Sequence, residues 1–356
     1  MNILKRAASA LAVPAGVLIA AILVTVAIIA AVGGDPVHSL REVIMGCFGS
    51  PYGFGQILYK TTSLAFTGLA VAVAFRAGLF NIGVEGQLYI GSFAGALVAL
   101  YLHNLPAVIL LPLVILTAAL VGALWAAIPG ALKVLFGAHE VITTIMLNFI
   151  SLSLVGWLLG FFAANATVHT EETPAGIWLP RLSKFIPAMH GTWANLSILI
   201  AIAAAGVVWF LFSRTSIGYE LRAIGLNPDA AETAGIPKGR TIVLAMALSG
   251  AVAGLTVSNE ILGGSHYFER DFPSGIGYLG IAVALLARNN PWAVILTAFL
   301  FSVISYAGLV IQSASTPREL ADVIAALIIL LTICGMKLRE QLMLRSRKKA
   351  LARASA

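Results

Sequence analysis

Three polar residues, Asn81, Glu85 and Gln87, interrupt an apolar stretch of this sequence at 80–102. A carboxyl group in an apolar environment is costly unless it is paired, so Glu85 is a candidate functional residue. Glycines around it indicate a broken or closely packed helix, the kind of element on which transporters build binding sites. These glycines are Gly78, Gly83 and Gly86. The alternative is structural, because Glu85 could instead cap a helix start or pair with Arg76, and the sequence leaves both open.

Two more apolar stretches carry polar residues at helical spacing, which places each set on one helix face. The first set is Thr144, Asn148 and Ser151, and the second is Ser249, Thr256 and Glu260. For Thr144, Ser151 and Ser249 we favour hydrogen bonding between helices, which is common in membranes. Asn148 and Glu260 are bulkier and harder to satisfy, which favours a place on a polar pathway. The predicted pathway set, with Thr144 included, is Asn81, Glu85, Gln87, Thr144, Asn148 and Glu260.

Motifs of enzyme chemistry are absent or incomplete. The sequence holds no Gly-Lys-Ser or Gly-Lys-Thr, so it has no Walker-type phosphate-binding loop. A Gly-x-Gly-x-x-Gly pattern at 275–280 opens an apolar stretch and follows no strand, so we interpret it as chance. His139-Glu140 starts a zinc-protease pattern that lacks its second histidine. We therefore predict no catalysis, no cofactor and no metal.

The composition predicts an integral membrane protein. Apolar residues make up 60% of the 356 residues and charged residues 10%, whereas a soluble domain has about 25% charged residues. Backbone in hydrocarbon must be hydrogen-bonded within the chain, and apolar stretches without period-two alternation select helices over a barrel. We predict an all-α polytopic protein, one domain over 1–356, with about ten spans. They lie at 8–32, 57–76, 80–102, 105–129, 139–163, 194–213, 241–262, 274–288, 291–312 and 319–336.

Two of these spans are unusual in length. The 8–32 span exceeds the roughly 7–15 apolar residues of a secretory signal, so we expect a retained anchor. The 274–288 span is short for a perpendicular crossing, so we expect a re-entrant or half-buried segment.

The Lys and Arg residues predict the orientation. With the amino terminus inside, sixteen of the 22 fall on the inner side and six on the outer side, and an excess of positive charge marks the cytoplasm. The inner set is Lys5, Arg6, Arg76, Lys133, Arg214, Arg222, Lys238, Arg240, Arg288, Lys337, Arg339, Arg345, Arg347, Lys348, Lys349 and Arg353. The outer set is Arg41, Lys60, Arg181, Lys184, Arg270 and Arg318. Both termini are therefore predicted to be cytoplasmic.

The longest predicted inner loop, 214–240, contains the signals of a short helix at 228–234, flanked by turns. Asn227 is a good N-cap, Pro228 suits the first helical position, and Gly235 ends the helix. Acidic residues near the start favour the positive end of the helix dipole. An amphipathic connector is the alternative, but a rigid, Ala-rich helix fits a docking element better.

Three motifs carry a resemblance to a known family. They are the segments at 78–87 (GLFNIGVEGQ), 140–148 (EVITTIMLN) and 218–237 (GYELRAIGLNPDAAETAGIP). The chain resembles the permeases of ABC importers for nucleosides and simple sugars, in the branch that includes ribose and branched-chain amino-acid permeases. The resemblance covers about 57–336 and leaves a basic tail at 337–356.

This resemblance implies a non-catalytic translocation subunit in the plasma membrane of a prokaryote. Its partners would be a cytoplasmic ATP-binding subunit, a second permease of similar sequence and an extracytoplasmic substrate-binding lipoprotein, with no nucleic acid. The resemblance also implies that the helix at 228–234 couples to the ATPase. The coupling residues would be Gly225, Asn227, Pro228, Asp229, Ala230, Ala231, Glu232 and Gly235. The alternative function is a secondary transporter that uses Glu85 and Glu260 as ion-coupling carboxylates.

Overall fold

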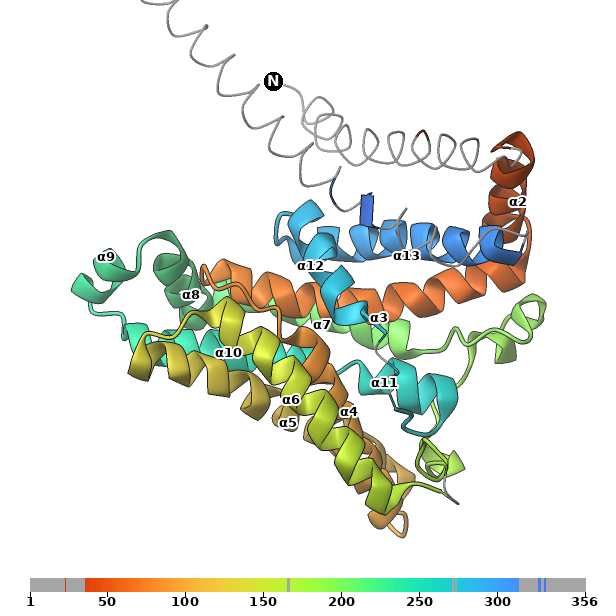
Figure 1. The fold of residues 1–356 in the computed structure, drawn as a ribbon, viewed down its shortest axis with the longest axis horizontal. Coiled ribbons are helices and arrows are strands. Elements are labelled where there is room, and N and C mark those ends of the chain that lie inside the picture. The colour runs from red at the N-terminus through yellow and green to blue at the C-terminus, as the bar shows by residue number, and fades with distance from the viewer. Residues whose placement is uncertain are drawn as a thin grey trace, which may run out of the picture. The chain divides into compact units, whose positions relative to one another are not determined.

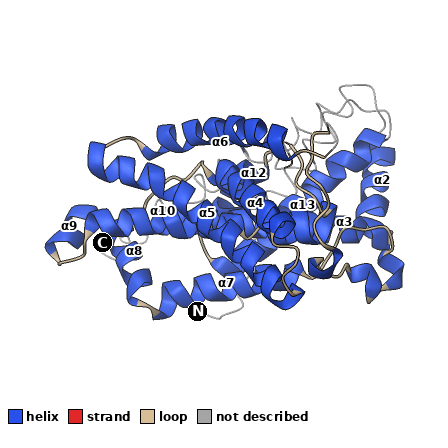
Figure 2. Ribbon diagram, turned by 90° about the horizontal axis from the view of Figure 1, so that it is seen from below, coloured by secondary structure: helices blue, strands red, loops and turns tan. Residues whose placement is uncertain are grey.

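The computed structural model describes residues 23, 36–164, 167–270, 272, 274–313, 326, 327 and 330 of the chain. Contacts between Cα atoms divide the chain into two units, Phe54–Ser302 and the combination of Met1–Gly53 with Val303–Ala356. Throughout the described ranges the regular structure is helical, and the β-bridges are isolated pairs (Figures 1 and 2).

The elements follow in chain order. The α-helices are α2 (Pro36–Phe48), α3 (Pro51–Arg76), α4 (Val84–Tyr101), α5 (Ala107–Phe136), α6 (Glu140–Phe162), α7 (Ser197–Arg214), α8 (Ser216–Leu226), α9 (Pro228–Thr233), α10 (Lys238–Gly254), α11 (Val257–Asn259), α12 (Ile276–Leu286) and α13 (Pro291–Ser313). The connection after α6 carries three short 3-10 turns, η1 (Ala175–Ile177), η2 (Leu182–Lys184) and η3 (Pro187–Met189). A π-helical segment, η4 (Glu260–Ser265), follows α11.

Six segments of the described chain are long and apolar enough to cross a membrane. They are Pro51–Arg76, Ala107–Phe136, Glu140–Phe162, Ser197–Arg214, Lys238–Ser265 and Pro291–Val310. Two more predicted spans correspond to α4 and α12, which are helical but not among the six. The remaining two, at 8–32 and 319–336, lie almost wholly outside the described residues, as does the tail at 337–356. An all-helical membrane protein is thus confirmed, while the number ten stays a prediction.

Two helices were not expected from the sequence. The structure has α2 in the predicted outer loop before α3, and α8 in the part of the 214–240 loop that we interpreted as a turn. The span predicted at 241–262 begins at Lys238 instead and is interrupted, because α10, α11 and the π-helical η4 follow one another. π-Helical turns often occur at functional sites.

The larger unit is held together by close packing of α4, α5 and α10. Small residues let these backbones approach: a Cβ atom on Gly91 would lie 2.6 Å from the carbonyl oxygen of Ala118. On α10, Cβ atoms on Gly250 and Gly254 would overlap the carbonyl oxygens of Gly122 and Ala118, respectively. Glycines at these positions therefore allow the close approach of the three helices.

Helices α8 and α9 lie together at one end of the larger unit in both ribbon views (Figures 1 and 2). An apolar core joins them to α3, α7 and α10. Its buried members include Leu79, Leu221, Ile224, Ala231 and Ile242. The short α9 is therefore part of a packed body and does not project alone.

Candidate functional site

Asn81, Gln87 and Ser249 form a hydrogen-bonded cluster with no more than 1% of any side chain exposed. The Asn81 amide donates to Gln87 Oε1 (3.0 Å) and to Ser249 Oγ (2.9 Å), and Gln87 Nε2 donates back to Asn81 Oδ1 (3.0 Å). Ser249 Oγ in turn donates to the backbone carbonyl of Ala70, 2.6 Å away. The cluster connects the segment before α4 with α3 and α10.

Asn148 holds the start of α4 from the other side. Its Oδ1 accepts from the backbone N–H of Gly86 (2.9 Å), and its amide donates to the Ile82 carbonyl (3.0 Å). The same amide donates to the hydroxyl oxygen of Tyr278, 3.1 Å away on α12. Because a Cβ on Gly86 would lie 2.8 Å from Asn148 Oδ1, glycine is what allows this approach. Asn148 therefore links α6 to α4 and α12.

The Glu85 carboxylate caps the start of another helix. Its Oε1 accepts from the N–H of Gly275 (2.7 Å), and its Oε2 accepts from the N–H of Gly277 (2.6 Å). These donors belong to the first turn of α12, where amides lack intrahelical acceptors and the dipole favours a negative group. Arg76, the other partner considered from the sequence, instead stacks its guanidinium 5.3 Å from the ring centroid of Phe212. In this structure Glu85 therefore caps α12, while its place on a polar pathway stays a prediction.

Glu260 belongs to a different network, at the start of the π-helical segment. Its carboxylate accepts from the Tyr59 hydroxyl (2.6 Å) and from the Ser63 hydroxyl, both on α3. The neighbouring Asn259 donates to Ser63 Oγ (2.6 Å) and accepts from Asn195 Nδ2 (3.0 Å). This second cluster joins α3 to the irregular end of α10–η4 and to the segment before α7.

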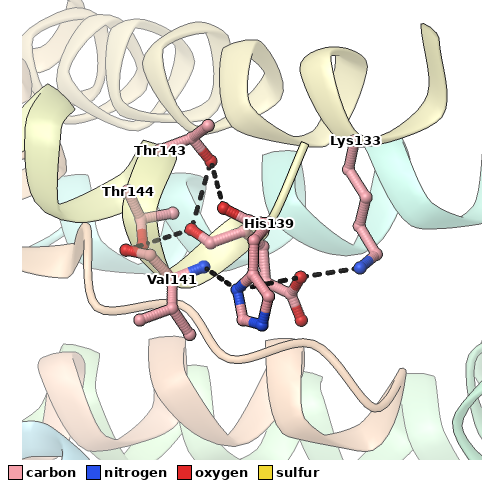
Figure 3. Close-up of polar contacts among 6 residues, drawn as sticks. Lys133, His139, Val141, Thr143 and Thr144 are labelled. Carbon is pink, nitrogen blue, oxygen red and sulfur yellow. Dashed lines mark hydrogen bonds and ion pairs between the residues drawn. The ribbon is translucent and has the colours of Figure 1, made fainter. Parts of the chain in front are cut away.

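Thr144 and the start of α6 have local roles (Figure 3). The Thr144 hydroxyl donates to the Glu140 carbonyl (2.7 Å), while His139 caps α6 by accepting from the N–H of Val141 (3.3 Å). Glu140 pairs with Lys133 at 2.6 Å. The incomplete zinc pattern at 139–140 is therefore a helix cap and an ion pair. Among the described residues, no group of three or more His, Cys, Asp or Glu side chains could hold a metal ion.

The structure brings most of the predicted pathway set together around the start of α4, and none of these side chains is more than 5% exposed: Asn81, Glu85, Gln87, Thr144 and Asn148. Glu260 stands in the separate second cluster. The sequence missed Tyr278 and Asn259 as polar partners, although Asn259 directly precedes Glu260. The sequence did contain a signal for the two α3 partners of Glu260, because Tyr59 and Ser63 are spaced i, i+4 and so share one helix face.

Helix α9 has the local structure that its sequence predicts. Asn227 Oδ1 accepts from the N–H groups of Asp229 and Ala230, each at 3.1 Å, and Gly235 takes a left-handed conformation with φ 86° after the helix. Asp229 pairs with Lys238 at 2.8 Å, and that ammonium lowers the pKa of the Asp229 carboxyl. Ala231 is buried at 5% exposure, so it anchors the helix to the core.

A cavity of about 750 Å³ lies beside α9. Its walls come from three places: residues 77–79 after α3, the end of α5 with Lys133, and the α8–α10 segment with Gly225, Pro228 and Glu232. Helix α9 therefore has open space on one side.

Comparison with known proteins gives consistent matches. Residues 53–333 match the family described as the permease component of branched-chain amino acid transport systems. The chain is 38% identical over 301 residues to the guanosine ABC transporter permease protein NupP of Bacillus subtilis, covering 83% of this chain and 84% of that protein. It is 33% identical over 317 residues to the nucleoside ABC transporter permease protein NupB of Lactococcus lactis, with 85% of each covered. The glucose ABC transporter permease protein TsgB13 of Haloferax volcanii is 33% identical over 333 residues, covering 90% of this chain and 86% of that protein.

Two of these organisms contain a second, more distant relative. The guanosine ABC transporter permease protein NupQ of Bacillus subtilis is 25% identical over 256 residues, covering 68% of this chain and 77% of that protein. The nucleoside ABC transporter permease protein NupC of Lactococcus lactis is 28% identical over 249 residues, covering 69% and 78%. Because the family match extends over most of the chain, this protein belongs to the family of branched-chain amino acid transport system permease components, the membrane subunits of ABC transporters, which transport solutes and are not enzymes.

Proposed function

We propose that this chain is the translocating subunit of an ATP-driven importer for nucleosides or related simple sugars. The observation that carries the proposal is the family match over residues 53–333. The guanosine and nucleoside permeases among the relatives favour a nucleoside, and the glucose permease keeps simple sugars within the proposed range. A carrier driven by an ion gradient is not favoured, because the relatives are ABC permeases.

The ATP-binding subunit is the first proposed partner. The sequence has no Gly-Lys-Ser or Gly-Lys-Thr, so ATP hydrolysis must come from another chain. Helix α9 is the proposed contact, because the Asn227 cap and the buried Ala231 give it a fixed shape. The proposed coupling residues are Gly225, Asn227, Pro228, Asp229, Ala230, Ala231, Glu232 and Gly235. They belong to the single permease domain that we propose for the chain.

A second permease and an extracytoplasmic binding lipoprotein complete the proposed assembly. Support for a paralogous permease comes from the pairs of relatives in two organisms, NupP with NupQ and NupB with NupC. The six predicted pathway residues stay proposals. Five of them are buried and Glu260 is half-buried, which is compatible with a polar interior. In the plasma membrane of a prokaryote, both termini and residues 214–240 would face the cytoplasm, with 164–193 outside.

Labelling of single cysteines tests this orientation. In a background with Cys47 and Cys334 replaced by Ser, cysteines are introduced separately at Ala175 and Glu232, both exposed in the structure. An impermeant maleimide applied to intact cells should label Ala175→Cys only, and permeabilised cells should show both labelled. Labelling of Glu232→Cys but not Ala175→Cys in intact cells would refute the orientation.

Ala231→Pro tests the coupling role of α9. Proline removes the amide that donates to the Asn227 carbonyl at 3.0 Å and clashes with the preceding turn. The variant should enter the membrane, lose co-purification of the ATPase and lose uptake. Ala175→Pro is the matched control, since it places proline at an exposed first-turn position of η1. Normal co-purification and normal uptake by Ala231→Pro would show that α9 is only a connector.

The energy source and the solute are tested together by uptake of labelled guanosine and ribose into cells. Uptake should survive collapse of the ion gradients by ionophores and stop when ATP is depleted. The opposite pattern would support the ion-coupled alternative, in which Glu85 and Glu260 carry the coupling charge. Competition between unlabelled nucleosides and sugars then identifies the preferred solute.

A further inference from the structure

At Gly225, helix α8 meets the end of α3 backbone to backbone. A Cβ atom on Gly225 would overlap the carbonyl oxygen of Arg76 and would lie 3.0 Å from the amide nitrogen of Gly78. In the other direction, a Cβ on Gly78 would lie 3.2 Å from Gly225 Cα. No side chain separates the two segments, so a displacement of one meets the other directly.

On one side of this contact lie α8 and α9, which are joined by a hydrogen bond and a shared apolar core. Asn227 joins them, because its N–H donates to the Ala223 carbonyl of α8 (3.1 Å) while its side chain caps α9. Ala231 of α9 and Ile224 of α8 share the same apolar core, with 5% and 1% exposed. A force on α9 therefore reaches Gly225.

On the other side lies the segment that leads into α4. Gly78 has φ 70°, the left-handed conformation that ends α3, and Leu79 behind it is buried with Ile224 in the same core. Asn81 follows, bound to Ser249 of α10, and Glu85 then caps α12 through its two N–H contacts. Seven residues thus connect the contact to two further helices.

The contact borders open space. The cavity of about 750 Å³ is lined by Gly78 and Leu79 on one side and by Ile224, Gly225 and Pro228 on the other. Because protein does not fill this volume, α8 and α9 have room to shift against the α3 end. Dense packing would transmit strain but would resist such a shift.

We propose that the contact of Gly225 with residues 76–78 is the joint that passes displacement of α8–α9 to residues 79–87 and to α12. Gly225 and Gly78 are then positioning residues of the transport step. Gly225 was assigned to the ATPase-coupling set from the sequence, and this proposal gives it a role inside the permease. The inference rests on the proposed function, in which α9 receives the movement of the ATPase.

The test uses the complete transporter in proteoliposomes and measures the ATP hydrolysed per solute imported. Gly225→Ala should raise this ratio about tenfold, because the added methyl separates the two backbones and leaves the Asn227 cap of α9 in place. Gly156→Ala on α6 is the matched control, since nothing lies within 4 Å of a Cβ there. A variant whose only defect is a smaller folded fraction would lose ATP hydrolysis and solute uptake by the same factor, so its ratio would stay the same. An unchanged ratio in Gly225→Ala therefore overturns the proposal.

A second variant covers the case in which Gly225→Ala fails to assemble. Ile224→Ala removes apolar contact beside the joint without adding volume. It should also raise the ratio of ATP hydrolysed to solute imported, and an unchanged ratio would again refute the proposal. Co-purification of the ATPase with the unaltered permease separates the two hypotheses. If the ATPase does not co-purify with the unaltered permease, the proposed docking function is refuted. If it co-purifies normally and the variants leave the ratio of ATP hydrolysed to solute imported unchanged, only the proposal about the Gly225 contact is refuted.

Discussion

Replacement of Glu85 by Gln tests whether a carboxylate held by fixed backbone N–H groups contributes more to stability than one held by hydroxyl groups, which can turn. Both Glu85 oxygens accept from backbone N–H groups, those of Gly275 at 2.7 Å and Gly277 at 2.6 Å. A glutamine side chain offers one oxygen and one NH₂ group. Whichever way the amide turns, one of the two backbone donors then faces another donor. These amides are fixed by the turn of α12 and cannot rotate away.

The expected loss follows from these contacts. An orphaned buried donor costs about 1–3 kcal/mol, and the remaining bond weakens by about 1 kcal/mol because its acceptor is no longer charged. We therefore expect Glu85→Gln to lower the free energy of unfolding by about 3 kcal/mol. An unfolding entropy of about 2.1 cal/mol/K per residue gives roughly 1.3 °C per kcal/mol for 356 residues, so the melting temperature should fall by roughly 4 °C.

Glu260→Gln is the matched comparison. Its carboxylate accepts from the hydroxyls of Tyr59 and Ser63, and a hydroxyl can turn to accept from an amide NH₂ instead of donating. The expected loss is therefore only about 1 kcal/mol. Thermal unfolding of the purified permease, followed by intrinsic fluorescence in one detergent, compares both variants with the unaltered protein. A fall for Glu260→Gln as large as that for Glu85→Gln would refute the role of fixed backbone donors.

Two further predictions concern capping and packing. Asn227→Ala should cost α9 about 1 kcal/mol, which hydrogen exchange would report as roughly fivefold faster exchange at the Ala231 amide; unchanged exchange would mean that the cap is dispensable. Gly250→Ala should cost about 1–3 kcal/mol because its methyl would overlap the Gly122 carbonyl, whereas Gly156→Ala, with open space around it, should be at least as stable as the unaltered protein. Equal melting temperatures for these two variants would contradict the packing argument.

Helix α9 was predictable because its determinants are local. Asn227, Pro228 and Gly235 lie within nine residues of one another, and capping chemistry depends on little beyond that distance. Helix α8 was missed although Thr215 caps it by accepting from the N–H of Gly218 at 3.1 Å. The prediction of a turn is wrong for Ser216–Leu226, because the loop holds a second N-cap signal at Thr215.

The partners of the intramembrane carboxylates were not predictable in the same way. The sequence singles out Glu85 and Glu260 by their charge, but their donors are 190 to 201 residues away along the chain. Only tertiary packing brings the glycine amides of α12 to Glu85. Gly275 and Gly277 had been noted as a chance dinucleotide pattern, and their observed role is to supply backbone donors close to a carboxylate.

The hydrogen bonds around α4 also limit how the predicted pathway residues can act. In the described structure Asn81, Gln87 and Asn148 already have protein partners, and Glu85 has both of its oxygens occupied. A solute could bind these groups only by replacing the existing partners, since an unpaired polar group in the interior is costly. Their participation in transport therefore requires a second arrangement of residues 79–87, in which the bonds to α10, α6 and α12 are exchanged. The Gly225 contact lies at the start of that segment. Under the proposed pathway, the segment that rearranges is therefore the one that adjoins α8 and α9.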